Sequence, residues 1–209
     1  MLFPTRLRNF IAVAIVGLSL AGCGYNTIPT AEEEAKAKWA DVQNQYQRRA
    51  DLIPNLVATV KGYAKQEQDT LTKVTEARAK ATSIQISADD VTNPDKMAKF
   101  QAAQGNLSQG LGRLLASVEA YPDLKSNENF LALQSQLEGT ENRITVARRD
   151  YNEAVREYNV TIRTFPAVIA AKVIYGAKPM VPFDAAEGAQ TAPTVSFDTP
   201  APAAKKGAN

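Results

Sequence analysis

Apolar residues recur in steps of three and four from Phe130 to Phe165 without a slip. This heptad-like spacing predicts a long helix over residues 126–164 that packs against other helices. Pro122 lies before the helix and Pro166 follows it, as expected of residues that bound a helix. The stripe consists of Phe130, Leu133, Leu137, Thr140, Ile144, Ala147, Tyr151, Ala154, Tyr158, Thr161 and Phe165.

A second stripe runs from Trp39 to Ala81 and keeps its phase through Pro54. A proline inside a helix usually kinks or breaks it, so two interpretations are open. The chain either reverses at Ile53-Pro54, which would give a conventional four-helix bundle, or forms one long kinked helix over residues 30–83. The unbroken phase and the lack of loop residues favour the kinked helix, with Thr30 as its N-cap. Asn or Asp side chains near Pro54 are expected to bond the backbone groups that the proline frees.

A third stripe, from Met97 to Tyr121, predicts a helix over residues 94–120. The short apolar segment 167–175 predicts a fourth, short helix with Gly176 as its C-cap. It either closes the bundle end or lies on a membrane surface, and core packing is favoured. Residues 177–209 are rich in Pro and Ala and are predicted to be a disordered tail. The predicted fold is therefore all-α: an antiparallel up-and-down bundle of long helices over residues 30–176, with the first helix kinked near Pro54.

Residues 1–22 have the pattern of an export signal: Arg6 and Arg8 precede an apolar run that is too short to span a bilayer comfortably. The segment Leu20-Ala21-Gly22-Cys23 resembles the lipobox of bacterial lipoproteins. Signal peptidase would recognise Leu20, Ala21 and Gly22, and the Cys23 thiol would be acylated. Residues 23–29 would then form the lipidated cysteine and a short linker. Gly24 favours the outer membrane, facing the periplasm, over the inner membrane. The alternative is an uncleaved anchor with an incidental cysteine.

Charge and composition limit the kinds of binding and catalysis that this chain can carry out. The 209 residues include 24 basic and 22 acidic side chains, no histidine and one cysteine. Without Arg6 and Arg8 the two signs balance, so nucleic-acid binding is not expected. The missing histidines exclude a Ser-His-Asp triad and, with a single cysteine, a zinc site. We expect no cofactor, no metal and no enzymatic activity; the alternative is a carboxylate-dependent enzyme using residues such as Glu67 or Glu141. Glu67 is expected to pair instead with Arg49, Arg148 or Arg149.

Two groups of residues are candidates for binding a protein partner. Arg48, Arg49, Asp51 and Asn55 cluster beside Pro54 and carry more charge than a solvated helix face needs. The pairs Tyr151-Asn152 and Tyr158-Asn159 repeat with a spacing of seven residues. The second group is either a partner-binding ladder or ordinary core, and core is favoured.

Two segments carry a resemblance to a known family. QRRADLIPNLVATVKGYAKQE (47–67) and LKSNENFLALQSQLEGTENRITVARRDYNEAVREYN (124–159) resemble the two halves of the LemA signature. The resemblance covers most of residues 25–176 and implies an antiparallel helical bundle and membrane association. It also implies protein partners such as TPM-domain proteins or HtpX-type membrane proteases, or a role in magnetosome-membrane assembly. We therefore expect a lipid-anchored, non-catalytic scaffold or adaptor at the periplasmic membrane surface; the alternative is a self-assembling structural homo-oligomer.

Overall fold

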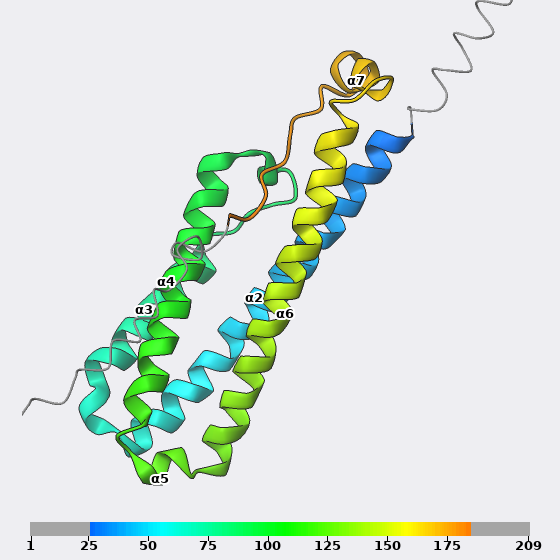
Figure 1. Cartoon of the computed structure of the whole chain (residues 1–209). Coiled ribbons are helices and arrows are strands. Elements are labelled where there is room, and N and C mark those ends of the chain that lie inside the picture. The colour runs from blue at the N-terminus through cyan, green and yellow to red at the C-terminus, as the bar shows by residue number, and fades with distance from the viewer. Residues whose placement is uncertain (1–25, 185–209) are drawn as a thin grey trace, which may run out of the picture.

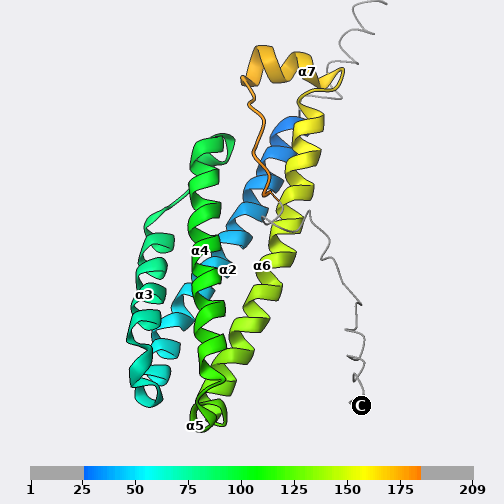
Figure 2. The ribbon, with the colours of Figure 1, turned by 60° about the vertical axis from the view of Figure 1, so that its left-hand side comes forward.

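The computed structural model describes residues 26–184, which form an antiparallel bundle of long helices without a strand. The long helices are α2 (Thr27–Tyr63), α3 (Gln68–Ser83), α4 (Pro94–Val118) and α6 (Glu128–Thr161). Helices α2 and α6 lie side by side along the bundle, and α3 and α4 form a hairpin against one half of that pair (Figures 1 and 2). The predicted all-α fold is confirmed, as are the helices placed at 94–120 and 126–164. The short elements are η1 (Lys65–Glu67), η2 (Asp90–Thr92), α5 (Pro122–Lys125), α7 (Ala167–Ala170) and a π-helical turn, η3 (Ala171–Tyr175).

The prediction of one helix over residues 30–83 is wrong. Helix α2 passes through Pro54 and ends at Tyr63, and Ala64 leaves the helical conformation with φ −117° and ψ 68°. After η1 the chain runs back along the bundle as α3 (Figure 1). The reversal therefore exists, but it lies ten residues beyond Ile53-Pro54. The stripe keeps its phase across the turn because both helices pack into one core cluster, which contains Val60, Ala64 and Leu71.

The interior divides into two clusters along the bundle axis. The cluster near the start of α2 is aromatic: the Trp39 ring centroid lies 5.4 Å from that of Phe100 and 5.3 Å from that of Tyr151. The cluster near α5 is aliphatic and is built mainly by Leu56, Leu107, Leu111, Leu114, Leu124 and Leu137. Both clusters consist of side chains that are almost completely buried, as expected of a close-packed interior.

The predicted disordered tail is wrong for its first residues. Residues 177–184, which we call the C-terminal strap, run in extended form beside α6 toward the loop before α4 (Figures 1 and 2). Met180 and Phe183 are buried, and the Phe183 ring lies 5.9 Å from Trp39 and 5.6 Å from Tyr151. A short segment without regular secondary structure is thus held by burying two large side chains in an existing core. Residues 1–25 and 185–209, including the predicted signal, Cys23 and the rest of the tail, lie outside the described residues.

The start of the bundle also differs from the prediction. Helix α2 begins at Thr27, and Thr30 lies in its first turn, where its hydroxyl donates to the Asn26 carbonyl at 2.7 Å instead of capping the helix. Residues 27–29 of the predicted linker are therefore part of α2. At the other end, Gly176 has φ +56° and is the left-handed C-cap expected from the sequence.

Candidate functional site

The four residues predicted to form a partner surface separate into two environments. Arg48, Asp51 and Asn55 are exposed, and their spacing places them on one face of α2, which we call the α2 face. Arg49 is only 1% exposed and points into the bundle. Its assignment to a partner surface is wrong, because position 49 continues the buried stripe between Tyr46 and Ile53.

Arg49 is the centre of an internal polar cluster that joins α2 to α4 and α6. Its Nη1 donates to Ser108 Oγ at 2.6 Å and to Glu141 Oε1 at 2.8 Å, and its Nη2 donates to Gln104 Oε1 at 2.6 Å. The Gln104 amide in turn donates to the Ala81 carbonyl of α3 at 3.4 Å. The guanidinium group also lies 5.0 Å from the centre of the Tyr46 ring. A buried charge is tolerated when it is paired and hydrogen-bonded, so this cluster fixes the register of the four long helices.

The backbone group that Pro54 frees has a partner from another helix. Proline has no N–H, so the carbonyl four residues earlier, that of Ala50, loses its helical hydrogen bond. Arg78 of α3 donates its Nε–H to this oxygen at 2.7 Å. The expectation that a neighbouring Asn or Asp would do this is wrong, because Asn55 and Asp51 face outward.

An open groove lies between α2 and the segment that joins α3 to α4. It has a volume of about 520 Å³, and five of its lining side chains are amides: Gln43, Asn44, Gln47, Gln85 and Gln104. The rim is fixed by the Ile86 carbonyl, which accepts hydrogen bonds from Trp39 Nε1 at 3.1 Å and Gln43 Nε2 at 2.7 Å. Gln47 also donates to Asp51 Oδ1 at 2.7 Å, so this groove borders the α2 face.

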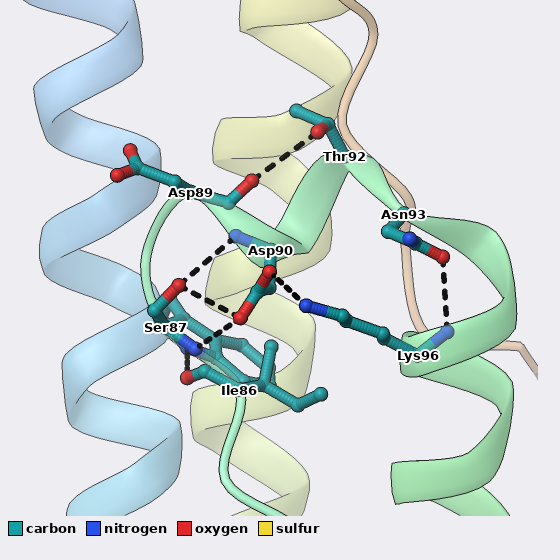
Figure 3. Close-up of polar contacts among 8 residues, drawn as sticks. Ile86, Ser87, Asp89, Asp90, Thr92, Asn93 and Lys96 are labelled. Carbon is teal, nitrogen blue, oxygen red and sulfur yellow. Dashed lines mark hydrogen bonds and ion pairs between the residues drawn. The ribbon is translucent and has the colours of Figure 1, made fainter.

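The turn that forms the far rim of this groove is held by one carboxylate (Figure 3). Asp90 accepts hydrogen bonds from Lys96 Nζ at 2.6 Å and from the Ser87 hydroxyl at 2.8 Å. The bonds from Lys96 and then Ser87 lower the pKa of the Asp90 carboxyl group. Asn93 caps α4 by accepting from the Lys96 N–H, so the rim is preorganised.

The two Tyr-Asn pairs of α6 hold the C-terminal strap. The Asn152 amide donates to the Phe183 carbonyl at 3.0 Å and accepts from the Phe183 N–H at 2.7 Å. Asn159 makes the same pair of bonds with Met180, both at 2.9 Å. Seven residues of helix and three residues of extended chain both span about 10 Å, so the repeat matches the strap. The tyrosines are buried core, as favoured from the sequence. The asparagines bind this chain's own segment, to which the Tyr151 hydroxyl also donates a hydrogen bond, at the Val181 carbonyl at 3.0 Å.

The strap was missed because it is short and contains two prolines, Pro179 and Pro182. Met180 and Phe183 stand among prolines in a segment with little capacity to fold alone. Their three-residue spacing, set against the seven-residue spacing of Asn152 and Asn159, is the signal that could have found the contact.

Glu67, one of the carboxylates considered for catalysis, has hydrogen-bond partners nearby. Glu67 accepts from the Tyr121 hydroxyl at 3.0 Å and from Thr70 at 3.3 Å, so its predicted pairing with an arginine is wrong. Arg148 instead lies over the Phe183 ring and donates to the Asp184 carbonyl, and Arg149 pairs with Asp150. Within residues 26–184, three or more potential metal-ligating side chains never come together. The same residues contain no helix of the length and hydropathy needed to cross a membrane.

These features define an antiparallel helical-bundle protein whose longest helices are locked by an internal arginine cluster and whose C-terminal strap is bound by an asparagine ladder. The chain belongs to the LemA family, which matches residues 38–197. It is 28% identical over 158 residues to magnetosome protein MamQ 2 of Paramagnetospirillum magneticum, covering 68% of this chain and 58% of that protein. Magnetosome protein MamQ of Magnetospirillum gryphiswaldense is 27% identical over the same shares. Protein LemA of Metamycoplasma hominis is 27% identical over 170 residues, 78% of this chain and 73% of that protein.

Proposed function

We propose that this chain is a membrane-anchored, non-catalytic scaffold that organises partner proteins at the periplasmic surface of a membrane. An acylated Cys23, exposed after removal of residues 1–22, would hold it there. The observation that carries the proposal is the start of α2 at Thr27, four positions after Cys23. The residues between them reach only about 10 Å, so the lipid would hold one end of the bundle at the bilayer.

The rest of the bundle would offer its sides to partners. Position 48 lies about 30 Å along α2 from Thr27, so the α2 face can reach clear of the lipid headgroups. Arg48, Asp51 and Asn55 are exposed there beside the amide-lined groove. Polar side chains of both signs next to an open groove suit a protein partner better than a small apolar ligand.

The relatives support a role at membranes without defining the partner. Two of the three are named magnetosome proteins. The chain spans 58% of the length of these relatives, so their names do not assign it a role in magnetosomes. TPM-domain proteins and membrane proteases are the partner classes to test first, and Gly24 favours the outer membrane as the place.

Proximity crosslinking with mass spectrometry in native membranes tests this proposal. One or two dominant partners should be recovered with the wild type and lost with Cys23→Ser. Recovery of self-links alone would contradict the scaffold role in favour of a self-assembling structural protein. A phenotype lost with Glu67→Gln or Glu141→Gln, in protein that still folds, would favour the enzymatic alternative.

The α2 face has a matched control on the chain. Arg48→Ala with Asp51→Ala removes two exposed, opposite charges three positions apart on α2. Glu153→Ala with Arg156→Ala makes the same change on α6. We expect the first pair to lose the dominant crosslinks and the second to keep them; equal recovery in both would place the partner site elsewhere.

A further inference from the structure

The segment at one end of the bundle exposes large apolar side chains and buries small ones. Phe165, Ile169, Val173 and Ile174 are 76%, 58%, 79% and 59% exposed. The fully buried side chains of α7 and η3 are alanines, Ala167 and Ala171, which join the cluster of Ile28 and Ile162, and Ala170 and Tyr175 are partly buried against the same cluster. A helix that served only to close the bundle would turn its large side chains inward. We call the four exposed side chains the apolar cap.

The apolar cap lies at the end of the bundle where α2 begins. Figures 1 and 2 show α7 beside the first turns of α2 and the last turn of α6, with α5 at the opposite end. The packing of Ile28 with Ile162 and Ala171 agrees with these views. Cys23 is three positions before Asn26, the first described residue. A lipid on Cys23 and the apolar cap would therefore meet the same surface.

The charges within residues 158–183, the segment that contains the apolar cap, have one sign. From Tyr158 to Phe183 the chain has no acidic residue, and its basic residues Arg163, Lys172 and Lys178 are all exposed. The three acidic residues at the start of α2 share two lysines of their own helix: Glu32 and Glu33 lie near Lys36, and Glu34 lies near Lys38. Exposed large apolar side chains within a basic segment fit the interface of a bilayer that contains anionic phospholipid.

We propose that the apolar cap inserts into the bilayer interface and sets the bundle upright on the membrane. This inference rests on the proposed membrane anchoring and adds a second, non-covalent contact to it. Two membrane contacts at one end of the bundle would hold its long axis away from the membrane plane. A lipid tether alone would leave the bundle free to tilt onto the membrane surface. With α6 at 34 residues, the α5 end would then stand about 50 Å from the headgroups.

Nitroxide labels on the full-length chain test the orientation. Protein purified from its native membranes is reconstituted into vesicles of phosphatidylethanolamine and phosphatidylglycerol. The label is placed at Val173→Cys or, as a matched control, at Leu131→Cys, an apolar position that is 48% exposed near α5. Collision with oxygen and with a water-soluble nickel chelate reports the depth of each label. We expect the Val173 label to collide with the chelate several-fold less than the Leu131 label does.

Three results would overturn the inference. Equal chelate access at both positions would show that the apolar cap stays in water. Dipolar broadening between Val173 labels, with no gain in oxygen access, would assign the apolar cap to a second copy of the chain. A Val173 label that is in water on vesicles but shielded from the chelate in native membranes would assign it to a protein partner.

The same samples separate this inference from the anchoring on which it rests. Intact mass reports whether Cys23 is acylated, independently of label depth. An acylated chain whose Val173 label is exposed to water would support the lipid anchor and contradict insertion of the apolar cap into the membrane. If the mass shows a free Cys23, the labels are placed in the Cys23→Ser background. A Val173 label in lipid would then support the inference without the anchor, and one in water would overturn both.

Discussion

Arg49→Ala should be among the most damaging single substitutions in the bundle. It removes the charged donor that Gln104, Ser108 and Glu141 share, and it leaves the buried Gln104 amide without its 2.6 Å partner. Hydrogen bonds to a charged group contribute about 1.5–3 kcal/mol each, and removing one partner of a buried charged cluster costs about 3–5 kcal/mol.

Two features place the expected loss at the lower end of that range. The Glu141 side chain is 44% exposed, so its pairing with Arg49 is screened and contributes about 1 kcal/mol or less. Within the described residues the buried Arg49 Nε has no hydrogen-bond partner, and that desolvation cost disappears with the side chain. We therefore expect Arg49→Ala to lower the free energy of unfolding by about 3 kcal/mol, a large part of the 5–15 kcal/mol typical of a domain.

Urea unfolding of the full-length chain in mild detergent, followed by far-UV circular dichroism, measures this loss. The matched control is the adjacent Arg48→Ala, whose exposed side chain should change the free energy by about 0.5 kcal/mol or less. The slope of the free energy against urea should stay the same in both, so that midpoints report stability. A loss below about 1 kcal/mol for Arg49→Ala would refute the assignment of Arg49 to a structural cluster.

The remaining predictions concern the proline, the strap and the buried tyrosines. Arg78→Met should lower the free energy of unfolding by about 1–2 kcal/mol, because it removes the hydrogen bond to the Ala50 carbonyl. This loss should vanish in the Pro54→Ala background, where a backbone N–H at position 54 again donates to that carbonyl. A double-mutant cycle without coupling between the two positions would contradict the prediction. Asn152→Ala should release the strap, seen as faster hydrogen exchange at the Phe183 amide, whereas unchanged protection would show that the aromatic core alone holds it. Burial raises the pKa of the Tyr151 phenol, so this tyrosine ionises at a lower pH in the unfolded chain than in the folded one. The free energy of unfolding should therefore fall as pH rises above about 10. Tyr151→Phe should make that fall shallower, and an identical slope in the variant would contradict the prediction.

Periodicity predicted the parts of the fold that pack by repetition. Along α6 the stripe is buried or half-buried from Phe130 to Thr161, because one helix contacts a continuous core and period alone decides which side chains face it. The same stripe fails at Phe165, which is 76% exposed beyond the end of α6. The period continues in the sequence there, but the long helix does not.

Hydrophobic periodicity could not predict the features that depend on contacts between residues distant in sequence. The reversal at Ala64 was hidden because its two flanking helices enter one core in phase. Arg49 occupies a core position that its charge appeared to exclude, and its partners lie 55, 59 and 92 positions away. The strap was predicted to be disordered because its own residues cannot form a folded segment. Its order comes from hydrogen bonds to Asn152 and Asn159 of α6.

The most direct test of the account is the intact mass of the chain purified from its native membranes. The account predicts a mature protein that begins at Cys23 and carries the added mass of acyl groups on that residue. Cys23→Ser should abolish both the cleavage and the added mass, and the chain should leave the position that wild type takes in a membrane fractionation. A wild-type chain that retains residues 1–22 with a free Cys23 thiol would contradict the central claim of lipid anchoring.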